Sequence, residues 1–371
     1  MKILYIGKYY YPYCGGIETV TKTLAEGMAA RGHQVTVLCH VSSRHEKDGI
    51  INGVRVLRFP IYGKTASVNS KIFNFLRKNT QNFDIVHIHS PNPPMEGACL
   101  FLSQKPPLVV SYHCDHYESK TIRAIIRPIY SQILRNAKAI VVATKNHIRY
   151  SRILSEFKNK CRVIPYGIDQ VNFKKTKHLV LIEKKILLRY GKYILFVGQL
   201  FEYKGLECLI RAMKNIDANL VILGRGPLQK KLKSMSLHYG LENKIYFLNN
   251  VDNPLDLSAF YHASQMLVLP SISNQEAFGL VQLEAMACAK PAVVSSLDSG
   301  VSLVQKNGVT GLYCKPRSSK ELAIKINSLL ENDAKRKRMG KIALKRLKKL
   351  YTSNKMIDAY EKLYRKVIDH N

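Results

Sequence analysis

Short apolar runs recur along the chain, and most are followed by a segment in which apolar residues have helical spacing. Runs of β-branched residues bounded by turn formers predict buried strands. Strands that alternate with helices in this way are typical of a doubly wound parallel sheet. In the first half of the chain, the predicted strands are Ile3–Tyr5, Gln34–Cys39, Val54–Phe59, Asp84–His89, Leu108–Tyr112, Ala139–Thr144 and Arg162–Pro165.

A second series of predicted strands fills the later half of the chain. Between the two series, a turn at residues 166–169 is followed by a Lys-rich span, Val171–Arg189, which lacks clear alternation. We place the domain boundary there. The strands of the second series are Tyr193–Val197, Asn219–Leu223, Lys244–Leu248, Met266–Leu269, Pro291–Ser295 and Gly311–Cys314.

The predicted fold class is therefore α/β, with two Rossmann-like doubly wound domains that face an interdomain cleft. We expect the domains at residues 1–168 and 169–350, and a helix at 351–371 that returns to the first domain. In such folds ligands bind at the carboxyl ends of the parallel strands.

The composition predicts a cytoplasmic protein, either soluble or peripheral to a membrane. Eight cysteines are scattered through apolar segments without a CxxC pair, which is typical of reduced thiols. The first residues form a strand that is too short for a signal peptide. No apolar run approaches the ~18 residues that a transmembrane helix needs.

The net charge of +32 requires an anionic partner or another explanation. Nucleic acid, an anionic membrane and phosphorylated small molecules are the candidates. No nucleic-acid-binding motif accompanies the charge, so we expect no nucleic-acid partner. The segment Lys120–Lys138 is basic and amphipathic, although Pro128 interrupts it. It either rests on an anionic membrane or packs on the sheet with its cations in water.

The loop after the strand at 266–269 is the most informative stretch for function. It contains Glu276 and leads into a predicted helix, Phe278–Ala289, with Gly279 in the first turn. A helix that begins after a loop of small residues offers unpaired backbone N–H groups and a positive dipole end to an anion. Glu276 is either part of that site or an ordinary N-terminal charge.

Three further turns between a strand and a helix contain candidate ligand contacts. The Gly15-Gly16 pair allows close approach of backbone to a ligand, although the GxGxxG fingerprint is absent. Lys204 lies at a helix start, where a cation is unfavourable unless it meets an anion. Arg225, between Gly224 and Gly226, is a second candidate phosphate contact.

A histidine cluster is predicted at the strand ends of the first domain. His113 follows the strand Leu108–Tyr112 and can donate to a sugar hydroxyl or stabilise charge. The alternatives are a packed histidine, or a metal site made with His87, His89 and His116, whose spacing matches no familiar zinc site.

These residues together form a known pattern. Across nearly the whole chain, the sequence resembles the retaining GT-B glycosyltransferases of family 4, whose marker Glu-x(7)-Glu is matched by Glu276 and Glu284. The companion motifs occur in the family's order, which makes the set specific. They are Gly15-Gly16, Asp84–His89, His113, Val163–Asp169, Gly198–Gly205, Gly226-Pro227 and Gly308–Leu312.

The resemblance implies a role for each matching residue. Glu276 would lie against the donor sugar, Glu284 would hold the donor ribose, and Lys204 would neutralise the diphosphate leaving group. The remaining contacts would be His113 near the sugar, Gly16 and the backbone of Phe278, Gly279 and Leu280 near the sugar and phosphates, and Asn250 with its neighbours at the base.

The resemblance also implies catalysis by charge stabilisation and positioning, without a metal ion or other cofactor. The chain has no Asp-x-Asp cluster for a divalent ion. It departs from the family at Gln199, where an arginine usually accompanies the lysine. An amide cannot replace a guanidinium against diphosphate, so either Arg225 or another cation compensates, or activity is reduced. A second departure is Ser299–Leu303, where family members often have Gly-Val-Pro-Glu.

The expected function is transfer of a hexose, with retention of configuration, from a nucleotide diphosphate sugar to a saccharide or lipid-linked acceptor. The motif arrangement looks most like bacterial mannosyltransferases of cell-surface polysaccharide, which include lipopolysaccharide enzymes, and it favours GDP-mannose over a UDP-sugar. The alternatives are an inactive sugar-nucleotide-binding protein, motivated by Gln199, and a nucleic-acid-binding protein, motivated by charge alone.

Overall fold

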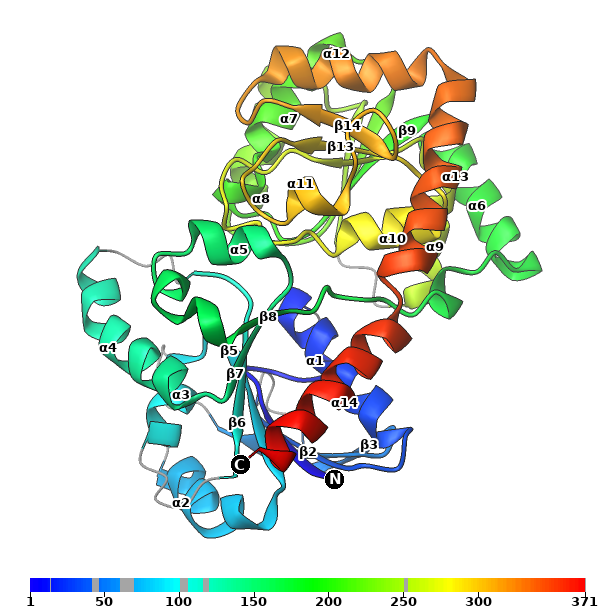
Figure 1. Ribbon diagram of the computed structural model, residues 1–371. Helices are drawn as coiled ribbons and strands as arrows, with labels where there is room; N and C mark the ends of the chain where they lie inside the picture. Colours follow the sequence, from blue (N-terminus) through cyan, green and yellow to red (C-terminus); the bar gives the residue numbers. More distant parts are fainter. Residues whose placement is uncertain are drawn as a thin grey trace. The chain divides into compact units, whose positions relative to one another are not determined.

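The computed structural model describes residues 1–13, 15–41, 47–60, 70–100, 106–115, 120–249 and 253–370. The chain folds into two compact α/β units (Figure 1). The first unit comprises Met1–Gly167 and Ser353–Asn371, and the second comprises Ile168–Thr352.

The first unit is built on an eight-stranded sheet with the order β3-β4-β2-β1-β5-β6-β7-β8. The β3–β4 pair is antiparallel and the other described pairs are parallel. The strands are β1 (Lys2–Ile6), β2 (Gln34–His40), β3 (Gly49–Ile51), β4 (Val54–Phe59), β5 (Ile85–Ser90), β6 (Leu108–Tyr112), β7 (Ala139–Val142) and β8 (Cys161–Val163). The helices are α1 (Gly16–Ala29), α2 (Ser70–Asn79), α3 (Pro93–Leu100), α4 (Lys120–Asn136), α5 (Lys145–Tyr150) and α14 (Ser353–Asp369), with 3-10 turns at Thr80–Asn82 and Leu154–Lys160.

Helix α14 belongs to the first unit although it follows the second in sequence, and it packs against α1 (Figure 1). A Cβ on Gly27 of α1 would collide with Ile357 of α14, so the two helices approach closely there. Arg31 extends the contact with ion pairs to Asp358 (2.5 Å) and Glu361 (2.8 Å). The last helix is thus fixed to the first by both packing and charge.

The second unit contains a six-stranded parallel sheet with the order β11-β10-β9-β12-β13-β14. Its strands are β9 (Tyr193–Val197), β10 (Asn219–Leu223), β11 (Ile245–Leu248), β12 (Leu267–Leu269), β13 (Ala292–Ser295) and β14 (Gly311–Cys314). Its helices are α6 (Lys177–Tyr190), α7 (Leu206–Ala212), α8 (Gln229–His238), α9 (Pro254–Ala263), α10 (Val281–Ala287), α11 (Val301–Val304), α12 (Ser319–Leu330) and α13 (Asp333–Leu350), with 3-10 turns at Val171–Phe173, Glu202–Lys204 and Met213–Asn215.

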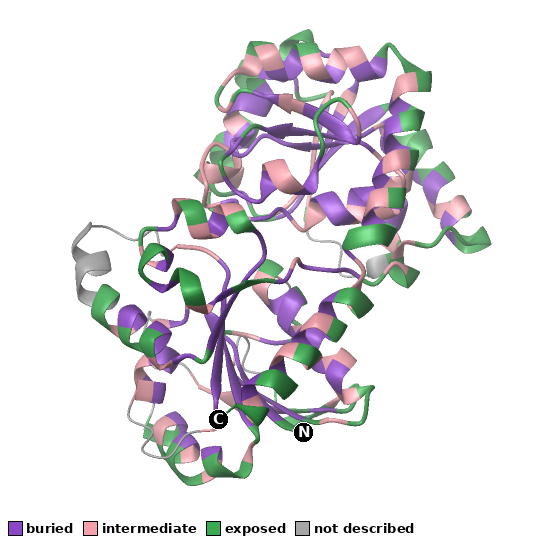
Figure 2. Cartoon of the chain, viewed as in Figure 1, coloured by how far each residue is buried: buried purple, intermediate pink, exposed green. Residues whose placement is uncertain are grey.

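Both faces of the second sheet are covered, which explains why its strands are continuously apolar. Ile194 and Phe196 of β9 pack on one face with residues of α7, α8 and α12. Tyr193 and Leu195 point to the opposite face and pack with residues of α6, α9 and α10. Figure 2 shows the buried strands of each sheet beneath helices whose outer faces are exposed.

The structure confirms two Rossmann-like units and every predicted strand, with bounds that differ by at most two residues. Strand β3 was not predicted, and the Lys-rich span after residue 170 contains α6, a regular helix. Of the helices that the structure describes, none combines the length and apolar character needed to cross a bilayer.

Candidate active site

The carboxyl ends of β9 and β12 bring two predicted site residues together. These strands are neighbours in the sheet, paired at Leu195 and Leu267. The segment after β9 leads to Lys204 in a 3-10 turn, and the segment after β12 carries Glu276. Residues 72 positions apart in sequence thereby meet at one edge of the sheet.

Lys204 and Glu276 form a buried ion pair, with 2.5 Å between Lys204 Nζ and Glu276 Oε2. Their side chains are only 12% and 9% exposed. Ser271 donates a second hydrogen bond to the same carboxylate oxygen, at 3.2 Å. Burial by itself lowers the pKa of Lys204, but the charge of Glu276 and the contact with Tyr203 outweigh burial and raise this pKa above its ordinary value. Lys204 therefore remains an ammonium at neutral pH.

Backbone contacts between the two segments fix this pair. The Ile272 N–H donates to the Tyr203 carbonyl at 2.8 Å. Gly205 has φ +70°, and a Cβ at this position would collide with the Pro270 carbonyl oxygen. Glycine is required at residue 205 because of both its conformation and this close approach.

The start of α10 provides a group of free amides near Glu276. The backbone N–H groups of Gly279, Leu280 and Val281 donate to no acceptor within the described residues. The helix begins at Val281, so the predicted start at Phe278 was too early. Gly279 precedes the helix with φ +73°, a conformation that favours glycine. Consecutive free amides at a helix start attract an anion.

Phe278 and Glu284 flank these amides in sequence. Phe278 is buried, and its ring packs edge-on against Tyr351 with centroids 6.2 Å apart. Glu284 lies in α10 and accepts a hydrogen bond of 2.6 Å from the Tyr261 hydroxyl. Burial raises the pKa of Glu284, although the bond from Tyr261 opposes the shift.

Gln199 and Arg225 lie on neighbouring turns at the ends of β9 and β10. The Leu200 N–H donates to the Arg225 carbonyl at 2.9 Å. A Cβ on Gly224 or Gly226 would collide with the opposite turn, so the two glycines permit this contact. The side chains of Gln199 and Arg225 are exposed. The Arg225 guanidinium makes no ion pair with any described carboxylate.

In the first unit, Gly16 is the first residue of α1, as its motif predicts. The sequence analysis missed Glu18, whose carboxylate folds back over Gly15 so closely that a Cβ on Gly15 would collide with it. Burial raises the pKa of Glu18, although a hydrogen bond from its own amide opposes the shift. An acidic residue in the first turn of a helix was the available signal.

His113 follows β6 and is buried, with both ring nitrogens engaged. Its Nε2 lies 2.9 Å from His89 Nδ1, and its Nδ1 is hydrogen-bonded to the Tyr166 hydroxyl. Burial lowers the pKa of His113 well below its ordinary range, and His89 adds to the shift. His113 is therefore a neutral imidazole whose polar atoms are directed to partners in its own unit.

The structure explains the cluster of histidines, for which a metal site was the alternative, by hydrogen bonds within the first unit. His87 and His89 do stack, with centroids 4.6 Å apart. His87, however, is hydrogen-bonded at Nδ1 to Tyr364 (2.5 Å) and at Nε2 to Ser111 (2.8 Å). No group of three or more potential ligands is placed to hold a metal among the residues that the structure describes. Two of the predicted residues, His116 and Asn250, lie outside that part of the chain.

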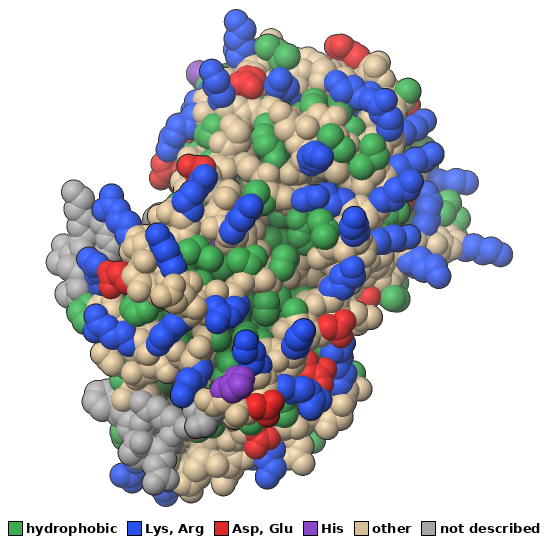
Figure 3. Space-filling model, viewed as in Figure 1, with side chains coloured by type: hydrophobic (Ala, Val, Ile, Leu, Met, Phe, Trp, Pro, Cys, Tyr) green, Lys and Arg blue, Asp and Glu red, His purple; other side chains and the backbone are tan. Residues whose placement is uncertain are grey.

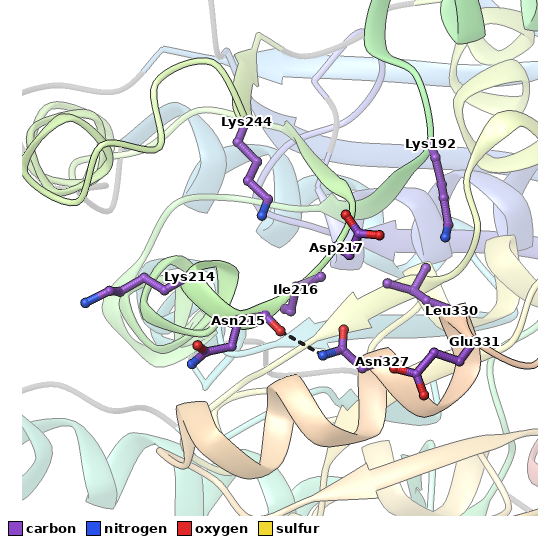
Figure 4. Close-up of a pocket in the computed structure, with 9 residues that line it drawn as sticks. All are labelled: Lys192, Lys214, Asn215, Ile216, Asp217, Lys244, Asn327, Leu330 and Glu331. Atoms are coloured by element: carbon purple, nitrogen blue, oxygen red, sulfur yellow. Dashed lines mark hydrogen bonds between the residues drawn. The ribbon is translucent and has the colours of Figure 1, made fainter.

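A cavity of about 400 Å³ opens at the opposite edge of the second sheet (Figure 4). Its three lysines lie between a helix and the next strand. Lys192 follows α6, Lys214 follows α7 and Lys244 lies between α8 and β11. Cations are favoured at the carboxyl ends of helices, so the lysines there have a structural explanation. The lining residues are Lys192, Lys214, Asn215, Ile216, Asp217, Lys244, Asn327, Leu330 and Glu331.

Two family models match most of the chain. Residues 14–171 match the model described as Glycosyltransferase Family 4, and residues 182–346 match Glycosyl transferases group 1. D-rhamnosyltransferase WbpZ of Pseudomonas aeruginosa is 31% identical over 95% of this chain and 93% of its own length. O-antigen chain mannosyltransferase C of Escherichia coli is 28% identical over 100% of this chain and 99% of its own length.

Solved structures show the same fold. Sucrose-phosphate synthase from Thermosynechococcus elongatus superposes with a TM-score of 0.84 at 21% identity, over 100% of both chains. Anabaena HepE in complex with UDP and glucose gives 0.82 at 18% identity, over 99% of this chain and 100% of that one. The family models match most of the chain, and the Pseudomonas aeruginosa relative aligns over nearly its whole length. The chain therefore belongs to the family 4 glycosyltransferases of the GT-B fold.

Proposed function

We propose that this glycosyltransferase moves a hexose from a nucleotide diphosphate sugar to a saccharide or lipid-linked acceptor, with retention of anomeric configuration. The observation that carries the proposal is the buried Lys204–Glu276 pair beside the free amides of Gly279, Leu280 and Val281. A sugar diphosphate requires a cation and an anion site for its phosphates, and a carboxylate that accepts hydrogen bonds from its sugar hydroxyls.

Each group has one task when the donor binds. The amides at the start of α10 bind the diphosphate, and Lys204 stabilises the negative charge that grows on it as the sugar departs. Glu276 accepts hydrogen bonds from the sugar hydroxyls. Because Tyr261 already holds Oε2 of Glu284, the other oxygen is left to accept from the ribose. The role of His113 beside the sugar stays a prediction from the family resemblance, because both of its ring nitrogens are hydrogen-bonded within the first unit.

The reaction needs no protein nucleophile in this proposal. The leaving phosphate helps to deprotonate the acceptor hydroxyl on the same face of the sugar, so configuration is retained. The protein supplies orientation and fixed positive charge. Lys204, the helix amides and Arg225 take the part that a metal ion plays in other glycosyltransferases.

Mannose as the sugar, with GDP-mannose as donor, is supported by the name of the Escherichia coli relative, an O-antigen chain mannosyltransferase. A lipid-linked acceptor is supported by the Mycobacterium leprae phosphatidyl-myo-inositol mannosyltransferase, 27% identical over 97% of this chain. A UDP-sugar is the alternative donor. We place the reaction in the cytoplasm, at the inner face of the cell membrane, where cell-surface polysaccharide is assembled.

A thermal-shift panel of GDP, UDP, GDP-mannose and UDP-glucose tests the donor. A ligand that binds the folded state raises the melting temperature in proportion to the logarithm of its concentration over Kd. We expect the guanosine ligands to give the larger shift. Equal or absent shifts for all four would contradict the proposal.

Three variants then test the site itself. Glu276→Ala should lower turnover most, Lys204→Ala should lower both kcat and donor affinity, and Glu284→Ala should weaken nucleotide binding. Tyr261→Phe is a milder control because it removes only the bond that orients Glu284. Unchanged turnover in Glu276→Ala would rule out this site as the reacting one.

A second candidate function, sugar-nucleotide binding without turnover, is favoured by the exposed neutral Gln199. If Arg225 supplies the missing charge, Arg225→Ala should reduce turnover by at least about tenfold, and Gln199→Arg in that background should restore it. If the protein binds donor without turnover and Gln199→Arg creates activity, the binding function is the correct one.

A further inference from the structure

The outward face of α6 combines exposed leucines with lysines. Leu181 is 58% exposed and Leu188 is 88% exposed. Lys177 and Lys184 complete a series with spacings of four, three and four residues, which places all four side chains on one face of the helix. The other face packs against α9 and buries Leu179, Glu183, Ile186 and Tyr190.

The charge around this face is positive. Between residues 170 and 192 there are seven Lys and Arg residues and a single acid, Glu183. That acid is buried and pairs with Lys175 at 2.8 Å. The other six cations make no ion pair with a described residue: Lys174, Lys177, Lys184, Lys185, Arg189 and Lys192. In Figure 3, Lys and Arg side chains project from the edge of the second unit where Figure 1 draws α6.

The described part of α4, the basic helix that the sequence suggested for membrane contact, differs from α6. Tyr130, Ile133 and Leu134 of α4 are buried in the core of the first unit. Its Arg127 pairs with Glu156 at 3.0 Å. The main apolar side chains of residues 127–136 are therefore packed in the core, whereas α6 leaves Leu181, Leu187 and Leu188 exposed among unpaired cations.

We propose that the outward face of α6 lies on an anionic lipid surface, with Leu181 and Leu188 between the headgroups and the surrounding lysines at the lipid phosphates. A helix with leucines on one face and cations beside them binds the interface of an anionic bilayer by apolar burial and by charge. The lysine stems extend along the interface while their ammonium groups reach the phosphates. This contact does not depend on the donor site.

A single-tryptophan reporter tests the depth of insertion, because the chain contains no tryptophan. Leu188→Trp should show a blue-shifted emission with vesicles of phosphatidylglycerol and phosphatidylcholine, and no shift with phosphatidylcholine alone. Leu237→Trp is the matched control, since Leu237 of α8 is 67% exposed in the same unit. The same shift in both reporters, or in neither, would overturn the proposal.

Charge reversal tests the electrostatic part in a vesicle sedimentation assay with the full chain. Lys184→Glu/Lys185→Glu should weaken binding to anionic vesicles by at least about tenfold. Lys230→Glu/Lys233→Glu on α8 changes the net charge by the same amount and should have a much smaller effect. Thermal shifts with GDP should be equal in both variants, which separates failed docking from failed folding or a failed donor site. Equal loss of vesicle binding in the two variants would mean that total charge, and not α6, determines binding.

The competing occupant of this face is a second copy of the chain. If the protein sediments as a dimer that Leu181→Ser/Leu188→Ser converts to a monomer, α6 is a dimer interface and the lipid proposal is wrong. A monomer that loses vesicle binding on the same substitution supports the proposal.

Discussion

Removal of either partner of the buried Lys204–Glu276 ion pair should lower the free energy of unfolding, because the other charge is left buried and unpaired. Glu276→Ala leaves a buried ammonium without its partner, so we expect a loss of about 3 kcal/mol in the free energy of unfolding. The double variant Glu276→Ala/Lys204→Met removes both charges and should recover much of the loss. Urea denaturation of the four proteins in this cycle measures the coupling. Equal stability of the single and double variants would mean that the pair is not buried in solution.

Glu96 of α3 should make the stability of the first unit depend on pH. Its side chain is fully buried, and burial raises the pKa from 4.5 to about 8, although hydrogen bonds from Ser90 and the Asn92 amide oppose the shift. Between these two values the folded state holds a proton that the unfolded state has lost, so stability falls as pH rises. The slope is up to about 1.4 kcal/mol per pH unit.

Glu96→Gln removes this titration and should be more stable relative to the wild type as pH rises from 5 to about 8. Below the unfolded pKa of 4.5 the difference should no longer change with pH. Denaturation midpoints of both proteins across this range provide the measurement, and parallel curves would contradict the assignment.

At the level of single residues, the sequence suggested which residues to consider for the site, but not which side chains surround them. The motif spacing located Lys204 and Glu276, but their direct contact depends on β9 and β12 being neighbours, which local sequence does not encode. His113 was predicted from its place after a strand, whereas its hydrogen bonds come from Tyr166 and His89, distant in sequence. Glu18 was missed because a glutamate in a first helical turn is ordinary in sequence.

At the level of elements, the contact between the Lys204 turn and the loop after β12 can be tested through two glycines with similar backbones. Gly205 has φ +70° and Gly240 has φ +64°, but only at Gly205 would a Cβ meet other atoms. Gly240→Ala should lower stability by about 1 kcal/mol from backbone strain alone. Gly205→Ala should lose more, and should also lose donor binding. Thermal denaturation and nucleotide titration measure the two effects, and equal losses would mean that the turn can relax.

Strands were predicted almost completely because both sheets bury their strands on both faces and make them apolar runs. The exceptions follow from the same physics. β3 is exposed at the antiparallel edge, so it lacks such a run. α6 was not recognised because Leu181 and Leu188 lie on its solvent face and blur the amphipathic pattern. The start of α10 was placed too early because the positive φ of Gly279 is not visible in sequence.

At the level of the whole molecule, α14 should be essential to the first unit only. Tyr360 and Tyr364 of this helix are fully buried and bonded to Ser111 and His87 on the sheet. A chain that ends before Ser353 should lose hydrogen-exchange protection in β1, β5 and β6 and keep it in the second unit.

Tyr364→Phe is the milder version of this test. It leaves His87 Nδ1 and the Tyr5 hydroxyl without their partner, which should cost about 1 to 3 kcal/mol. Loss of protection in both units of the truncated chain, or in neither, would contradict the division described above.

The return of α14 also determines the order in which the protein can be completed during synthesis. Domains generally fold as they leave the ribosome, the N-terminal one first. Here the first unit lacks its last helix until residues beyond Ser353 have been made, so the second unit, continuous in sequence, can be finished earlier. Until then, the face of β1 and β5 that α14 covers is exposed in the nascent first unit. Its tyrosines and histidines are accessible to a chaperone during this interval.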